Sequence, residues 1–128
     1  MYRAYGLLKP DSDFNVDQAI ARLTPRFPGF AINRMGDQIT ISKGDWEIQL
    51  ALVTGPHIRE ETQGITDKIA GMDQSETEVL LSSDRRVEVW SEIPDPFMEH
   101  FNDFLQVVEV LKSFNGLVAV DPHERSLM

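Results

Sequence analysis

Cysteine is absent from this chain of 128 residues, and histidine occurs only three times. Without cysteine the protein can have no disulfide framework, no thiolate metal site and no cysteine nucleophile. A chain without thiols suits a reducing compartment, and we therefore predict a cytoplasmic location.

Long apolar segments are also missing. No run approaches the roughly 18 consecutive apolar residues that a membrane-spanning helix requires. The apolar stretch within residues 1–10 is too short and too interrupted to be the hydrophobic part of a signal peptide. We therefore expect a soluble protein that is not exported and has no membrane partner.

The motifs of the common enzyme classes do not occur. The chain has no G-x-x-x-x-G-K-S/T or G-x-G-x-x-G loop, no H-E-x-x-H zinc motif and no G-x-S-x-G nucleophile motif. These absences disfavour phosphate, dinucleotide, zinc and hydrolase chemistry. We predict no cofactor, no metal site and no catalytic residue, although a site assembled from distant residues stays open.

Acidic residues outnumber basic residues by 21 to 12, which gives a formal net charge of −9. This charge repels phosphate backbones, so nucleic acid is not expected as a partner. Two explanations of the charge stay open. It can serve solubility alone, or it can attract a basic protein partner.

The length and the composition predict one globular domain over residues 1–128. Hydrophobic residues make up 41% of the chain, enough to form a core without covalent staples. The most informative stretch is 30–55, where apolar and polar residues alternate around the Gly36-Asp37 and Gly44-Asp45 pairs. This pattern is typical of a β-meander with one buried face, which would include Trp46, Ile48 and Leu50.

The remaining elements are predicted from periodicity and from turn signals. We expect helices over 15–23, 56–69 and 97–114, and further strands over 2–8, 79–81, 87–92 and 117–120, with a flexible polar linker at 71–76. The helix over 97–114 has the clearest apolar face, which includes Phe97, Phe101 and Phe104. The predicted fold class is α+β, in the order β-α-β-β-β-α-β-β-α-β. A mostly antiparallel sheet of five to seven strands would be packed on one face by about three helices.

Few side chains are grouped in a way that indicates chemistry. His57 lies near Glu60 and Glu61, and His100 lies near Asp103, so each could place an imidazole beside a carboxylate on a helix. We favour the simpler interpretation that these are solvated helix turns. The adjacent pair Arg85-Arg86 is most simply a set of exposed turn residues, and an anion contact is the alternative.

A group of acidic residues between positions 88 and 103 is the best candidate for a binding surface. If strand 87–92 leads directly into the following helix, these residues could form one acidic edge beside an aromatic anchor. The edge would consist of Glu88, Trp90, Glu92, Asp95, Glu99 and Asp103. An ordinary solvated face is the alternative.

Three functional hypotheses follow. We favour a non-catalytic, acidic protein-binding domain of bacterial type, whose size and charge would suit an immunity protein against a basic toxin or a small secretion chaperone. The second is an enzyme or small-ligand-binding domain with a site near His57 or His100. The third is a self-assembling structural module, in which an exposed sheet edge would produce a homodimer.

Overall fold

One antiparallel sheet organises the fold, and the structure, a computed structural model, describes residues 1–128. Its strands are β1 (Tyr2–Leu8), β2 (Ala31–Met35), β3 (Gln38–Lys43), β4 (Trp46–Thr54), β5 (Arg85–Ser91), β6 (Leu117–Asp121) and β7 (Ser126–Leu127). The helices are α1 (Val16–Leu23), α2 (His57–Thr66), α3 (Gln74–Leu81) and α4 (Phe101–Lys112), with a short 3₁₀ turn η1 (Thr24–Arg26) after α1. The predicted α+β class and mostly antiparallel sheet are confirmed.

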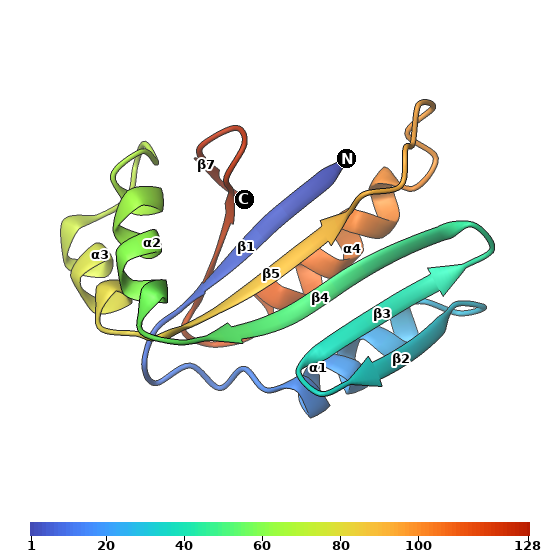
Figure 1. The fold of residues 1–128 in the computed structure, drawn as a ribbon, viewed down its shortest axis with the longest axis horizontal. Helices are drawn as coiled ribbons and strands as arrows, with labels where there is room; N and C mark the ends of the chain where they lie inside the picture. Colours follow the sequence, from blue (N-terminus) through green and yellow to red (C-terminus); the bar gives the residue numbers. More distant parts are fainter.

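The strands lie in the order β2-β3-β4-β5-β1-β6-β7, and every neighbouring pair is antiparallel (Figure 1). The meander predicted at 30–55 forms β2, β3 and β4. Its two hairpins turn at Gly36 and Gly44, whose φ values of 59° and 60° lie in the left-handed region that glycine tolerates best.

Helices α1 and α4 cover one face of the sheet and enclose the main core. Alternate residues of the strands point to this face, so their apolar side chains gather there. The largest cluster of buried residues joins the meander to α4, as expected for the face that includes Trp46, Ile48 and Leu50. Complete burial of a side chain such as Ile48 or Leu50 contributes about 1.5–3 kcal/mol to the stability of the fold.

Helices α2 and α3 lie against the opposite face, and only at one end of it (Figure 1). There Leu7 of β1 and Val120 of β6 pack with Ile69 and Leu80 in a second cluster. The expectation that all the helices cover a single face is therefore wrong. Leu7 and its neighbour Leu8 point to opposite faces, yet both are buried because each face has its own helical cover.

Two further predictions differ from the structure. Residues 79–81 belong to helix α3 rather than to a strand, because Asp73 caps a helix that begins at Gln74, inside the predicted linker. The helix predicted from position 97 begins at Phe101. The structure also contains a short strand that the sequence pattern does not predict, β7 at residues 126–127.

Candidate functional site

The connection between β5 and α4, residues 92–100 (the 92–100 loop), extends away from the rest of the fold (Figure 1). Pro94 and Pro96 prevent the strand from continuing, since proline cannot donate to a sheet ladder. Asp95 then fastens the loop. Its carboxylate accepts hydrogen bonds from the Tyr2 hydroxyl at 2.6 Å and from the backbone N–H groups of Glu99 and His100 at 3.0 Å each.

These bonds alter the acidity of both side chains. Burial and the hydrogen bond to the negatively charged Asp95 raise the pKa of Tyr2 to about 12. Burial alone would raise the pKa of Asp95, but the hydrogen bonds from Tyr2 and from the two backbone amides outweigh it and lower that pKa below its usual value. At neutral pH the loop is therefore held by a carboxylate and a neutral phenol.

Two large apolar side chains stand at the tip of this fixed loop. Phe97 is 81% exposed and Met98 is 59% exposed. Met98 has a φ of 54°, which is uncommon for a residue with a side chain, and its N–H donates to the Asp95 carbonyl at 3.0 Å. The prediction that Phe97 starts the core stripe of the helix is wrong, because this turn separates it from Phe101.

The structure brings together part of the predicted acidic edge. Asp95, Glu99 and Asp103 lie around His100, since Asp95 accepts from the amides of positions 99 and 100, and the Asp103 carboxylate lies 3.0 Å from His100 Nδ1, from which it can accept a hydrogen bond. Glu92 begins the same loop and is exposed.

The other two residues of the predicted edge lie on the sheet itself. Glu88 and Trp90 are on the face opposite to α1 and α4, and both are half-buried. Glu88 lies 3.6 Å from the guanidinium of Arg86, toward the end covered by α2. Trp90 is paired across the strands with Arg3 and Gln49, on the uncovered part of that face.

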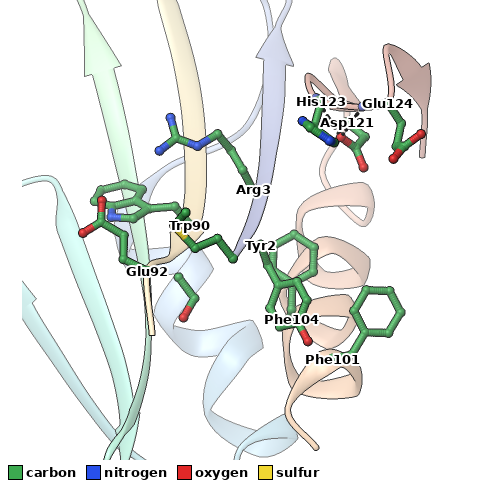
Figure 2. A pocket seen from close by; sticks show the side chains of 11 residues that line it. Tyr2, Arg3, Trp90, Glu92, Phe101, Phe104, Asp121, His123 and Glu124 are labelled. Atoms are coloured by element: carbon green, nitrogen blue, oxygen red, sulfur yellow. Dashed lines mark hydrogen bonds between the residues drawn. The ribbon is translucent and has the colours of Figure 1, made fainter. Parts of the chain in front are cut away.

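A cavity of about 430 Å³ lies at the start of β1. Figure 2 shows Arg3 and Trp90 on one side of β1, with Tyr2, Phe101 and Phe104 on the other. The Asp121 carboxylate at its rim already accepts from the N–H groups of His123 and Glu124. The cavity joins the base of the 92–100 loop to the open face of the sheet.

The histidines are placed differently from one another. His100 stacks on Trp46 with ring centroids 4.5 Å apart, and it lines a second hollow of about 330 Å³ together with Lys43 and Asp95. His57 is exposed at the start of α2. No group of three or more histidine, aspartate or glutamate side chains is arranged to hold a metal ion.

The expectation that Arg86 is an exposed turn residue is wrong. This residue lies within β5 with its side chain 7% exposed, and its Nη2 is 2.9 Å from the Glu61 carboxylate of α2. The guanidinium also lies 4.7 Å from the centre of the Tyr5 ring. Neither this ion pair nor the Tyr2–Asp95 bond has a sequence signal, because the partners lie far apart along the chain.

Comparison of the chain with family models finds no match, and comparisons with curated proteins and with solved structures find none either. Among the helices of the fold, none combines the length and the apolar character needed to cross a bilayer.

Proposed function

We propose that this protein is a non-catalytic binding domain that engages a basic protein partner through the 92–100 loop. The observation that carries the proposal is the exposure of Phe97 and Met98 at the tip of a loop whose backbone Asp95 holds in place. Large apolar side chains that are exposed side by side are typical of protein interaction sites, because a partner removes their surface from water.

The ordered backbone of the loop supports a role of Phe97 and Met98 in binding a partner. Interfaces obtain most of their energy from a few aromatic and large apolar side chains that enter pockets on the partner. An anchor that is already ordered loses less conformational entropy on binding than a mobile one. The three hydrogen bonds to Asp95 supply this order before any partner arrives.

The charges around the tip indicate the chemistry of the partner. Glu92 and Glu99 are exposed on the same loop, and the whole chain carries a charge of −9. Such a surface attracts a basic protein and repels an anionic membrane, which is the other common partner of exposed Phe and Met side chains. We therefore propose that the tip enters an apolar pocket on the partner and that basic residues surround this pocket.

The size and charge of the chain suit two kinds of bacterial protein. An immunity protein neutralises a basic toxin by binding it, and a small secretion chaperone masks a partner before export. Either role requires tight, non-catalytic binding, and we propose that it takes place in the cytoplasm. The predicted edge residues Glu88 and Trp90 would then contribute only if the partner also reaches the open face of the sheet.

Affinity capture from the protein's own cells tests the proposal. Wild-type protein and the double variant Phe97→Ala/Met98→Ala are compared with Val79→Ala, a control that shortens an exposed apolar side chain on α3. Any captured protein is then produced in pure form and its Kd is measured. We expect the double variant to bind about 30-fold or more weakly, as for loss of an interface hot spot, and the control to bind as wild type does.

The role of charge has a separate test with the same purified partner. Glu92→Gln and Glu99→Gln should slow association and reduce its dependence on salt, since exposed charges act mainly on the association rate. Glu60→Gln on α2, at the other end of the sheet, is the matched control. Capture of no basic protein at low salt, or equal binding by all variants, would overturn the proposal.

A second candidate is small-ligand binding beside His100, which the stacked Trp46 and the adjoining hollow favour. Asp103 lies 3.0 Å from His100 Nδ1, and this contact would leave the other ring nitrogen for a ligand. Binding there would change the fluorescence of Trp46 during titration with a panel of small acids and amines. No change in fluorescence or in melting temperature with any member of the panel would reject this candidate.

A further inference from the structure

We infer that strand β2 is a self-pairing edge through which two copies of this chain form an antiparallel dimer. This inference rests on a different part of the molecule and does not depend on the partner proposed for the 92–100 loop. It begins with the position of β2, which forms one margin of the seven-stranded sheet and pairs only with β3 (Figure 1).

The hairpin geometry leaves backbone groups of β2 without partners in the sheet. Met35 and Gln38 close a two-residue hairpin at Gly36, so they form a hydrogen-bonded pair. Because hydrogen-bonded pairs alternate along an antiparallel ladder, the backbone N–H and C=O groups of Asn33 and Ala31 also point toward β3. The N–H and C=O groups of Ile32 and Arg34 are consequently directed away from the sheet.

Most of the usual protections of an edge strand are absent from β2. Proteins block exposed edges with proline, bulges, lysines or very short strands. β2 is five residues long and contains no proline. Its only charged side chain, Arg34, forms an ion pair with Asp17 of α1, and Met35 at its end is 85% exposed.

The distribution of charge favours a second copy at this edge. Two chains of charge −9 repel each other over most of their surfaces. Residues 18–36, however, contain three arginines and no acidic residue. The segment that includes β2 therefore has a local excess of positive charge, and Asp17, the acidic residue that contacts it, is paired with Arg34.

The strand is also complementary to itself. In an antiparallel pair centred on Asn33, this residue would face its own copy, and the outward groups of Ile32 would bond those of Arg34 in the partner copy. Met35 would lie opposite the small Ala31. The pairing would cover the half-buried Ile32, which already packs against the main core.

The other edge of the sheet explains why assembly would stop at two copies. β7 has only two residues, too few for a stable ladder with another chain. One usable edge for each chain gives a closed, symmetric dimer rather than a fibre. Because five residues bury less area than the roughly 1,200 Å² of a standard stable interface, we expect a weak dimer that forms at high concentration.

Sedimentation velocity over about a hundredfold range of concentration tests this inference. The wild-type mass should rise from 14.6 kDa toward twice that value. Arg34→Pro removes an outward N–H group and should keep the protein monomeric. Arg34→Ala, which loses the same ion pair with Asp17 but keeps the N–H, should dimerise as wild type does. Circular dichroism establishes that both variants are folded.

A charge swap identifies the contact itself. Asn33→Asp and Asn33→Lys each place like charges opposite one another in the dimer, so each should weaken it several-fold, as for like-charge cross-strand pairs. An equimolar mixture of the two should associate more strongly than either alone. The same exchanges at the exposed Asn102 of α4 are the control.

Three results would overturn the inference. They are a wild-type mass of 14.6 kDa at all concentrations, equal dimerisation of Arg34→Pro and Arg34→Ala, and a mixture of the Asn33 variants that associates no better than its components. The first result would mean that β2 does not pair with its own copy, so that an extended segment of another protein would be the alternative partner. The second result would mean that the dimer contact lies on another surface.

Discussion

The hydroxyl of Tyr2 donates a hydrogen bond of 2.6 Å to the carboxylate of Asp95, which lies 93 residues further along the chain. The bond joins the first strand of the sheet to the loop that carries Phe97 and Met98. The position of this loop therefore depends on the central strands and on its own local turn together. A surface built in this way is ordered without a partner, as the proposed binding function requires.

The Tyr2–Asp95 bond predicts a loss of stability at alkaline pH. The pKa of Tyr2 is raised from 10.0 to about 12 in the folded protein, so between these values the unfolded chain gives up a proton that the folded protein retains. The free energy of unfolding should therefore fall as pH rises through this window. Tyr2→Phe should remove this part of the decline, measured as urea midpoints over the same pH range. If the urea midpoint fell equally steeply with pH in the variant and in wild type, the pKa of Tyr2 would not be raised by folding.

Asp95 predicts an effect of the opposite sign in acid. Its pKa is lowered in the folded state, mainly because the bonds from Tyr2 and the two amides outweigh the effect of burial. Its contribution to stability is therefore present above its usual pKa of 3.8 and lost as pH falls through the lower native value. Asp95→Asn should show a smaller acid-induced loss than wild type. The amides of Glu99 and His100 should also exchange hydrogen faster in Asp95→Ala, while those of β1 should remain protected.

The buried guanidinium of Arg86 predicts a coupled pair of mutations. Glu61→Gln leaves the Arg86 charge with only the more distant Glu88 as a counter-ion. Because Glu61 is half-exposed, the cost should be about 1–2 kcal/mol, below that of a fully buried pair. In an Arg86→Met background the same change should cost nearly nothing, whereas Glu60→Gln should be neutral in both. Equal costs of Glu61→Gln in the two backgrounds would show that the ion pair does not stabilise the fold.

Periodicity predicted the parts of this fold that local pattern decides. The alternation at 30–55 specified the β2–β3–β4 meander and its buried face, because a strand with one covered face must alternate. The apolar run at 79–81 was too short to distinguish strand from helix. The signal for α3 lay earlier, at Asp73, whose carboxylate accepts from the N–H of Ser75.

The candidate site was less predictable, because long-range contacts create it. The spacing of Phe97, Phe101 and Phe104 is helical, yet Phe97 is exposed because Asp95 folds residues 95–100 into a separate turn before α4. The sequence indicated the acidic residues of this region but not the apolar tip between them. Likewise, no local pattern places Glu61 of α2 beside Arg86 of β5.

Two glycines predict opposite effects of the same substitution. Gly116 has a φ of 71°, and a Cβ there would lie 2.9 Å from the Ser12 Cα. Gly116→Ala should therefore lower the free energy of unfolding by about 2 kcal/mol or more, because both the left-handed backbone and the contact with a main-chain atom oppose it. Gly64 lies inside α2 with no atom within 4 Å of a Cβ, and Gly64→Ala should raise stability by about 0.5–1 kcal/mol. Urea unfolding of the two variants measures both changes. If Gly116→Ala were as stable as wild type, the close packing of residue 116 against Ser12 would have to be wrong.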